Sequence, residues 1–335
     1  MDKSDVKNII ENCSFPGKCG NPELVETHIS WIILAEDFAW KIKRPVEFSF
    51  LDFSTPEKRK HFCEEELKLN RRMEPEMYLD VLPVTRDLEI SESETGKEII
   101  DYALKMKRMD NSREMDKLLA DNKVTPGNID KLAAKIAGFH KNATVIKNAF
   151  RTLRFHEEFA DIANHYDFIT EKLGDEFKQK VSMCIENSYS YLNKIRNFSN
   201  HRVITGFQRD CHGDLNASNI FLYDDPVIFD CIEFSSELRQ IDVLNDIAFL
   251  CVDLDFYNRE DLSEIFYEKY REYFGMEENE DEFELFRYYK CYRANVRAKV
   301  TLINIQKQND SDNTRKLEDA KKYIDLMTNY MDLKI

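Results

Sequence analysis

The residues best able to do chemistry lie within one short segment, residues 211–230. Asp214 is followed five residues later by Asn219, with apolar residues between them. An acidic turn containing a proline then leads into a short apolar stretch that ends at Asp230. Carboxylate and amide oxygens are the ligands that Mg²⁺ prefers, and a carboxylate can also accept a proton. The pattern predicts a loop, a hairpin and a second loop that bring these three side chains to one end.

These residue types suit phosphoryl transfer, whose loose transition state needs mainly positioning and charge neutralisation from the protein. We predict that Asp214 accepts a hydrogen bond, and then the proton, from a substrate hydroxyl. Asn219 and Asp230 would ligate Mg²⁺, with the phosphates of ATP filling other positions. Asp and Asn are also common in ordinary turns. Their combination in one segment nevertheless favours catalysis, and we call residues 211–222 the catalytic loop.

Two neighbouring features would support the catalytic loop. His212 could be a general base or a ligand, but we favour a residue that packs against the loop and hydrogen-bonds it. Asp242 and Asp246 are four residues apart, so they share a helical face among apolar neighbours. A buried carboxylate needs donors, and the exposed backbone amides of the catalytic loop are candidates. Asp242 also suits the cap of a helix.

The elements that must position this segment fall into a β-rich part and a helical part. The strand-like stretches, rich in β-branched and aromatic residues, are residues 28–34, 38–43, 81–85, 88–90 and 99–106, with a short turn between the third and the fourth. A helix is predicted from residue 56 to about residue 73. After Met109 the pattern is helical nearly to the end, with strand character only at 203–232. We therefore predict an α+β fold of two lobes, with a small β-rich lobe at 1–109 and a larger, mainly helical lobe at 110–335. This is the order that a protein-kinase-like bilobal fold requires, in which the first lobe would bind the nucleotide and the second would carry the catalytic and substrate residues.

The β-rich part should supply a cation for the ATP phosphates, positioned by a carboxylate from its helix. Lys41 lies in an apolar strand, and Lys43 shares its face because side chains alternate along a strand. We favour Lys41, which is deeper in the apolar run. Of the consecutive acids Glu64, Glu65 and Glu66, the last shares a helical face with apolar residues. Lys41 with Glu66 is the favoured pair, and the other combinations stay open.

Composition and charge exclude several classes of protein. The 335 residues include 48 basic and 63 acidic side chains, a net charge of −15. This disfavours nucleic-acid or membrane-surface partners, which require a positive surface. No run approaches the roughly 18 apolar residues of a membrane span, and the N-terminus lacks a signal core, so we expect a cytoplasmic protein. The eight cysteines are expected to be reduced, although Cys13 and Cys19 could approach within a loop.

The motifs HGDLNASNIFL, VIFD and IDVLNDIAFL resemble the aminoglycoside phosphotransferase and small-molecule kinase branch of the protein-kinase-like superfamily. THISWIIL and FAWKIKRPVEF resemble bacterial and archaeal proteins described only as aminoglycoside-phosphotransferase-like, many of which carry a second, P-loop kinase domain. The resemblance covers about residues 25–260. It implies ATP and Mg²⁺ as cofactors, with the roles given above for the named residues. It also implies that segment 101–109, which includes Met106, holds adenine through its backbone, and that 110–200 shapes the acceptor pocket.

Three departures from the resembled pattern refine this expectation. The chain has no Gly-x-Gly-x-x-Gly, so the phosphate-covering loop must be His28-Ile29-Ser30 or its neighbours, and Ser30 is our candidate nucleotide contact. Asn216 stands two residues after Asp214, where protein kinases usually place a lysine, which points away from protein substrates. The chain has no Gly-x-x-x-x-Gly-Lys-[Ser/Thr], so the appended P-loop domain is expected to be absent.

The expected function is transfer of the γ-phosphate of ATP to a hydroxyl of a small molecule. The small-molecule substrate is also the expected binding partner. The alternatives are a serine/threonine protein kinase-like enzyme and a nucleotide-binding pseudokinase with a regulatory role. The intact set of Asp214, Asn219 and Asp230 argues against a pseudokinase. A cationic acceptor such as an aminoglycoside gains no support from the acidic charge, which is spread over the whole chain. The acceptor, the oligomeric state and the choice between ATP and GTP stay open.

Overall fold

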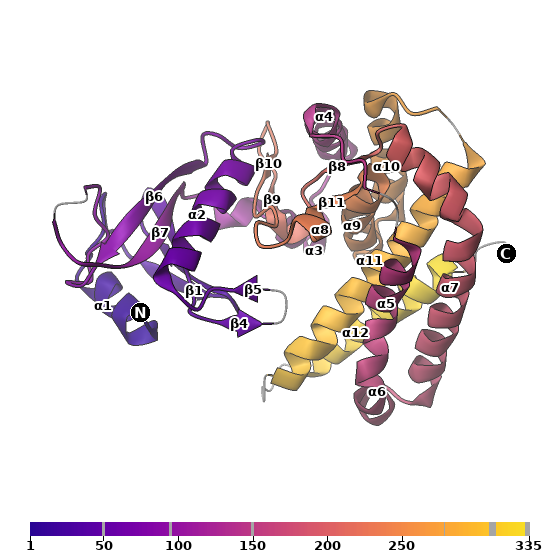
Figure 1. The fold of residues 1–335 in the computed structure, drawn as a ribbon, viewed down its shortest axis with the longest axis horizontal. Coiled ribbons are helices and arrows are strands. Elements are labelled where there is room, and N and C mark those ends of the chain that lie inside the picture. Colours follow the sequence, from indigo (N-terminus) through magenta and orange to yellow (C-terminus); the bar gives the residue numbers. More distant parts are fainter. Residues whose placement is uncertain (49–50, 94–95, 149–150, 278, 308–312, 332–335) are drawn as a thin grey trace. The chain divides into compact units, whose positions relative to one another are not determined.

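The computed structural model describes residues 1–48, 51–93, 96–148, 151–277, 279–307 and 313–331 (Figure 1). These residues form two compact units. The first unit comprises Met1–Glu114 and Asn219–Leu238, and the second comprises Met115–Ser218 and the chain from Arg239 onward. The sequence suggested one boundary after residue 109, whereas here residues 219–238 return to the first unit. The catalytic loop therefore contributes residues to both units.

The first unit is built on a five-stranded antiparallel sheet with the strand order β1-β2-β3-β7-β6 (Figure 1). Its strands are β1 (Glu23–Glu26), β2 (Ser30–Leu34), β3 (Phe38–Lys43), β6 (Tyr78–Thr85) and β7 (Ile99–Lys107). Its smaller strands are β4 (Glu47–Phe48), β5 (Leu51–Asp52), β9 (Ile220–Phe221) and β10 (Val227–Ile228). Its helices are α1 (Lys3–Glu11) and α2 (Pro56–Asn70), and α8 (Ser236–Arg239) begins at its end.

Strand β3 has two faces with different partners. Trp40 and Ile42 point to one side, where they pack with α1 in a buried apolar cluster. Lys41 and Lys43 point to the opposite side because strand side chains alternate. Helix α2, which packs against β6 and β7, brings its own side chains to the lysines. Thr55 caps this helix by accepting a hydrogen bond from the Lys58 amide at 3.3 Å.

Two predictions for this unit need correction. Residues 88–90 do not form a strand: Val84 and Ile90 make an isolated bridge, and Leu88 has a φ of 58°, which ends any extended pairing. The expectation that all cysteines are reduced is wrong for one pair, because Cys13 and Cys19 form a disulfide with Cα atoms 5.6 Å apart. The other six cysteines form no disulfide among the described residues, and all are buried. The loop between these two cysteines is short enough to bring their Cα atoms within bridging range.

The second unit is mainly helical, as the 3.6-residue period predicts. Its helices are α3 (Met115–Ala120), α4 (Pro126–Asn142), α5 (Thr152–Ala160), α6 (Tyr166–Lys172), α7 (Asp175–Ile204), α9 (Val243–Phe256), α10 (Glu260–Phe274), α11 (Glu280–Lys307) and α12 (Asn313–Met331). Helix α9 is buried over nearly its whole length and contacts α10, α11 and α12. Strands β8 (Gln208–Asp210) and β11 (Gln240–Asp242) pair antiparallel at the start of the catalytic loop and of α9. Within the described ranges, no helix is both long and apolar enough to cross a membrane.

Candidate active site

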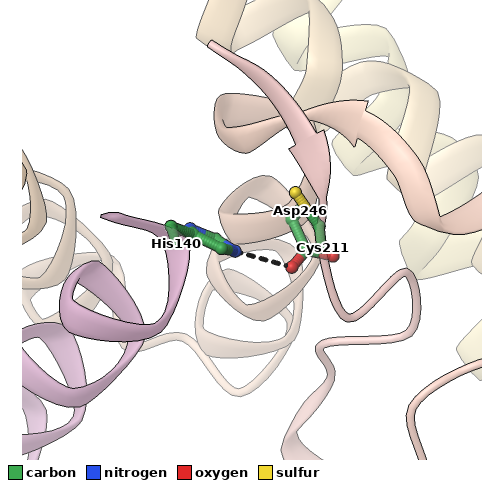
Figure 2. A group of neighbouring side chains, drawn as sticks. All are labelled: His140, Cys211 and Asp246. Atoms are coloured by element: carbon green, nitrogen blue, oxygen red, sulfur yellow. Dashed lines mark hydrogen bonds and ion pairs between the residues drawn. The ribbon is translucent and has the colours of Figure 1, made fainter. Parts of the chain in front are cut away.

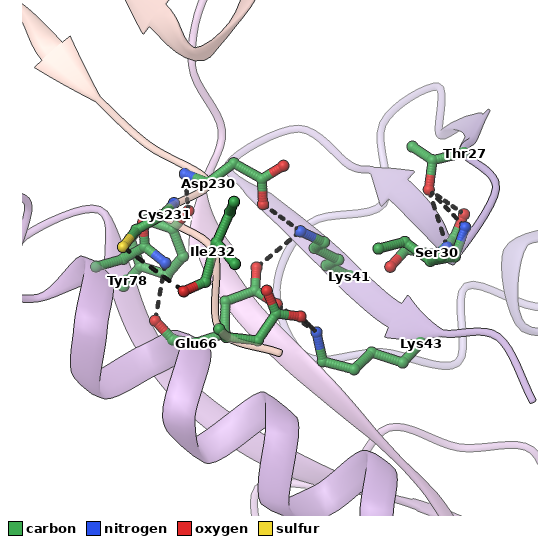
Figure 3. A network of polar contacts seen from close by, with 12 residues as sticks. Thr27, Ser30, Lys41, Lys43, Glu66, Tyr78, Asp230, Cys231 and Ile232 are labelled. Atoms are coloured by element: carbon green, nitrogen blue, oxygen red, sulfur yellow. Dashed lines mark hydrogen bonds and ion pairs between the residues drawn. The ribbon is translucent and has the colours of Figure 1, made fainter. Parts of the chain in front are cut away.

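In the first unit, one carboxylate of α2 binds both lysines of β3 (Figure 3). Glu66 Oε1 lies 2.8 Å from Lys41 Nζ, and Glu66 Oε2 lies 2.6 Å from Lys43 Nζ. Glu66 is fully buried, whereas Glu64 is exposed and Glu65 is half-buried. Of the acids that the sequence left open, Glu66 is therefore the one that faces the sheet, and it pairs with both candidate lysines.

Each lysine also binds a second acid from the segment that follows β10. Lys41 Nζ lies 2.5 Å from Asp230 Oδ1, and Lys43 Nζ forms an ion pair with Glu233. The five groups carry two positive and three negative charges, and we call them the lysine–acid network. The side chain of Asp230 is 40% exposed, while those of Glu66, Lys43 and Glu233 are at most 5% exposed. Asp230 is thus the member of the network whose side chain is most exposed to solvent.

The electrostatics keep both lysines charged. Burial alone would lower the pKa of Lys41, but the charges of Asp230 and Glu66 raise it well above its usual value. The same balance, with Glu233 and Glu66 as the main acids, raises the pKa of Lys43. Two buried ammonium groups are thus held in place beside the partly exposed carboxylate of Asp230, in a network with one excess negative charge that a cation can balance. Such a site suits a polyphosphate that is bound together with a divalent cation.

A prediction tests how far the first unit depends on this network. Changing Glu66→Gln leaves two buried lysines without their shared carboxylate, which should lower the free energy of unfolding by about 3–5 kcal/mol. Glu64→Gln is the matched control on the same helix, and because Glu64 is exposed it should change the stability by no more than about 0.5 kcal/mol. Urea unfolding followed by circular dichroism measures both. Equal midpoints for the two variants would contradict the assigned network.

Asp230 is held in an unusual backbone conformation. Its φ is 63°, in the left-handed region that few residues other than glycine adopt, although Asp and Asn tolerate it. The Asp230 amide donates to the Tyr78 hydroxyl at 3.0 Å, and the Cys231 amide donates to Asn70 Oδ1 at 2.9 Å (Figure 3). These bonds fix the carboxylate beside Lys41. A constrained non-glycine residue of this kind is characteristic of functional sites.

Asn219 belongs to the same unit and stands directly before β9, the first strand of the predicted hairpin. Strands β9 and β10 pair antiparallel through Ile220 and Ile228. Just outside that pair, the Phe229 amide donates to the Asn219 carbonyl at 3.0 Å. The hairpin therefore places the backbones of Asn219 and residue 229 side by side, directly before Asp230. The binding of Mg²⁺ by the side chains of Asn219 and Asp230 stays a prediction.

The two remaining nucleotide candidates of the first unit occupy adjacent parts of the sheet. Ser30 is buried on β2 opposite Lys43, and its hydroxyl has no hydrogen-bond partner among the described residues. The turn before it closes without glycine, because Thr27 Oγ1 accepts from the Ser30 amide at 2.9 Å. Met106 is buried on β7 in register with Ala39. The nucleotide contacts proposed for Ser30 and Met106 stay predictions.

In the second unit, Asp246 of α9 anchors the start of the catalytic loop. Its carboxylate accepts from the His212 amide at 3.1 Å and from the Gly213 amide at 2.8 Å. Gly213 has a φ of 86°, a conformation that favours glycine. Asp246 thus takes the anchoring role expected from its spacing. Asp242 instead caps α9 and pairs with Arg202 at 2.6 Å.

His140, at the end of α4, is a functional neighbour that sequence reasoning missed. Its Nε2 lies 3.0 Å from Asp246 Oδ2 (Figure 2). Its Nδ1 lies 2.8 Å from the Tyr270 hydroxyl. With Cys211 it forms a buried cluster whose ligand-type atoms lie within 4.8 Å of one another. Both ring nitrogens are already engaged, so the cluster supports the loop. The available signal was a histidine on the apolar face of the predicted 126–142 helix.

His212 and Asp214 complete this part of the loop. His212 is buried, and its Nδ1 accepts from the Asp214 amide at 3.3 Å. This contact agrees with the favoured interpretation of His212 as a residue that shapes the loop. Asp214 is half-buried. The role of its carboxylate as the proton acceptor stays a prediction.

The anchoring of the loop should depend on pH. Burial alone would raise the pKa of Asp246, but hydrogen bonding and charge from His140, with His212 and Arg293, lower it to about 2. A depressed pKa stabilises the fold above the unfolded value near 3.9, and this contribution is lost as the pH falls towards about 2. Asp246→Asn should therefore cost on the order of 2 kcal/mol at pH 6 and much less at pH 2.5. Unfolding free energies measured across this range test it, and a pH-independent difference would contradict it.

Comparison with solved structures defines the class of fold. The chain is similar to the GDP complex of aminoglycoside 2'-phosphotransferase-IIIa, with a TM-score of 0.55, 12% identity, and coverage of 97% of this chain and 99% of that one. It is similar to a choline/ethanolamine kinase family protein from Mesorhizobium loti (TM-score 0.52, 13% identity, 98% and 99% coverage). It is also similar to a choline kinase from Cryptosporidium parvum, with a TM-score of 0.53, 11% identity, and coverage of 98% of this chain and 95% of that one. The chain therefore has the protein-kinase-like fold of these structures, and the predicted fold is confirmed.

In sequence, the chain is related to uncharacterized proteins of two mycobacteria. It is 31% identical over 286 residues to proteins of Mycobacterium tuberculosis and Mycobacterium bovis. The match covers 83% of this chain and 54% of each relative, so the chain spans about half the length of these curated proteins. No family model matches the chain.

Proposed function

We propose that this chain is a phosphotransferase that uses ATP and Mg²⁺ to phosphorylate a hydroxyl of a small molecule. The observation that carries the proposal is the lysine–acid network, in which the buried Lys41–Glu66 pair also binds Asp230. In kinases an ion pair of this kind, together with a metal-binding Asp, anchors the ATP phosphates. The fold shared with aminoglycoside phosphotransferases and choline kinases agrees with this role.

The residues of the first unit fit the nucleotide and its metal ion. Asn219 and Asp230 offer the hard oxygen donors that Mg²⁺ selects, and the carboxylate of Asp230 is 40% exposed. Bound Mg²⁺ would neutralise charge on the phosphates of ATP. Lys41 would hold these phosphates from the sheet, and Glu66 keeps Lys41 charged and oriented. Ser30 and Met106 are our candidates for further contacts with the nucleotide.

The residues of the catalytic loop would then perform the transfer. Asp214 accepts a hydrogen bond from the acceptor hydroxyl, which orients its oxygen towards the γ-phosphorus. A bond forms between that oxygen and the γ-phosphorus while the bond to the β–γ bridging oxygen breaks. ADP leaves with the electron pair, and the hydroxyl proton passes to Asp214. Asp246 and His140 fix the backbone from which Asp214 projects.

A small-molecule acceptor is favoured by the loop itself. Asn216 occupies the position of the lysine of protein kinases, and its amide nitrogen donates to the Asp214 carbonyl at 3.2 Å. The solved structures of the same fold bear the names of choline, ethanolamine and aminoglycoside kinases. These names suggest amino alcohols and amino sugars as the first acceptors to assay.

A phosphorylation screen tests the proposed function. The protein is incubated with Mg²⁺, terminally labelled ATP and a panel of amino alcohols, sugars, polyols and aminoglycosides, and in parallel with cell extract. We expect label in a small molecule and none with Asp214→Asn. Label in polypeptides alone would establish a protein kinase instead. Binding of Mg-ATP without transfer to any acceptor would establish a pseudokinase, and either result would overturn the proposal.

A further inference from the structure

The catalytic loop lacks a cation at the position where protein kinases place one. Asn216 stands there, and its buried side chain is hydrogen-bonded within the loop. Besides its bond to the Asp214 carbonyl, its Oδ1 accepts from the Ser218 amide at 3.0 Å. This side chain therefore shapes the loop and brings no charge to a transferring phosphoryl group. The transition state spreads negative charge over three oxygens, so a cation is expected from elsewhere in the chain.

Helix α11 carries two arginines that are connected to the loop, one directly and one through Asp253. Arg293 and Arg297 are four residues apart and share a helical face. Arg293 is buried, donates to Asn245 Oδ1 at 2.7 Å and lies 3.3 Å from the Gly213 carbonyl. Arg297 contacts Asp253 of α9, which in turn binds the backbone of the loop. The loop is thus contacted before Asp214 by Arg293 and after it by Asp253, which holds Arg297.

Asp253 connects Arg297 to the loop after Asp214. Asp253 Oδ2 accepts from the Ala217 amide at 2.9 Å. Asp253 Oδ1 lies 2.9 Å from Arg297 Nε and 2.8 Å from Arg297 Nη2. The carboxylate is therefore shared between the loop backbone and the guanidinium group. This arrangement fixes the guanidinium beside a segment that begins three residues after Asp214.

Arg297 is more open than its partners. Its side chain is 28% exposed, whereas that of Asp253 is 1% exposed. The guanidinium lies 5.6 Å from the ring centre of Phe249 and 5.5 Å from that of Tyr323, which limits its movement. Burial alone would lower the pKa of Arg297, but the charges of Asp253, Tyr323 and Asp214 raise it. Through Asp253, which binds both Arg297 and the Ala217 amide, the guanidinium is connected to the loop that carries Asp214.

We propose that Arg297 is a catalytic residue that contacts the transferring phosphoryl group from the acceptor side. This rests on the proposed function, because Asp214 marks the acceptor side only if it receives the acceptor's proton. A fixed, partly exposed cation near that carboxylate can donate to the equatorial oxygens as the new oxygen–phosphorus bond forms. Its contacts with Asp253 and the two rings orient it before the reaction, so little reorganisation is needed. Arg297 supplies the charge that Asn216 lacks.

Binding of a transition-state mimic tests the proposal without a known acceptor. ADP and Mg²⁺ are titrated into the protein with and without aluminium fluoride, which imitates the transferring phosphoryl group. The wild-type protein should bind ADP more tightly with aluminium fluoride. Arg297→Ala should lose about 10²-fold or more of this gain while its affinity for ADP alone stays unchanged. Guanidinium ion in solution should restore part of the gain.

Controls separate this role from a structural one. Arg287 lies on the same helix, its side chain is 27% exposed, and it contacts Glu284 of its own helix at 3.4 Å. Arg287→Ala should keep the full gain. If Arg297→Ala does not fold, Arg297→Gln, whose amide can still donate to Asp253, replaces it. Full gain in a folded Arg297 variant would overturn this proposal alone, whereas a wild-type protein that shows no gain would count against the proposed function itself.

Discussion

Replacing Asp214 by Asn is expected to lower the rate of phosphoryl transfer by about 10²–10⁴-fold, the usual contribution of a general base. The substitution keeps the size of the side chain and removes only its ability to take the proton of the acceptor. Affinity for Mg-ATP should stay near the wild-type value, because the nucleotide contacts proposed here belong to Lys41, Glu66, Asn219 and Asp230. Turnover with the acceptor found in the phosphorylation screen, and nucleotide titration, measure the two effects.

The control for this prediction is an exposed acid in the same stretch of chain. Asp225 lies in the turn between β9 and β10 and is exposed. Asp225→Asn should leave both turnover and nucleotide affinity within twofold of the wild-type values. Near-wild-type turnover in Asp214→Asn would show that another group accepts the proton, and the assignment of Asp214 as base would then be wrong.

The local parts of the candidate site could be predicted because they follow from spacing. The distance of five residues between Asp214 and Asn219 and the apolar stretch before Asp230 define loop, hairpin and loop. Strand alternation placed Lys41 and Lys43 on one face. The helical period identified Glu66 as the inward acid. Each of these inferences uses residues within one element, where geometry is set by the backbone.

The long-range parts could not be predicted, because they depend on which elements pack together. Glu233 pairs with Lys43 across 190 positions of sequence, and nothing near either residue specifies the other. The sequence posed a choice between Lys41 and Lys43, while a single carboxylate with two oxygens binds both. Arg297 is connected to the loop, through Asp253, only because α9 and α11 pack together. The disulfide between Cys13 and Cys19 was not predicted, because the absence of a signal core led us to expect reduced cysteines. The short loop between the two residues was the local feature that favoured it.

One further substitution in the lysine–acid network should strongly lower activity without unfolding the protein. Asp230→Asn removes a negative ligand for Mg²⁺ and should lower phosphoryl transfer by about 10³-fold, a loss of the size seen when charge stabilisation of a transition state is removed. Because the Asp230 side chain is 40% exposed, its ion pair with Lys41 should contribute no more than about 1 kcal/mol to stability. ATP affinity with and without Mg²⁺ is the diagnostic measurement. Wild-type affinity should depend on Mg²⁺, and that dependence should be largely lost in the variant.

Glu233→Gln is the informative counterpart, because it changes the other end of the network. Glu233 is buried with Lys43, so its loss should lower the free energy of unfolding by about 3–5 kcal/mol. Its folded fraction should still show Mg²⁺-dependent binding of ATP, since the open carboxylate of Asp230 remains. The two variants therefore separate a metal ligand from a structural acid within one cluster of charges. If Asp230→Asn kept the full Mg²⁺ dependence, Asp230 would be a structural partner of Lys41, and the metal site would have to lie elsewhere.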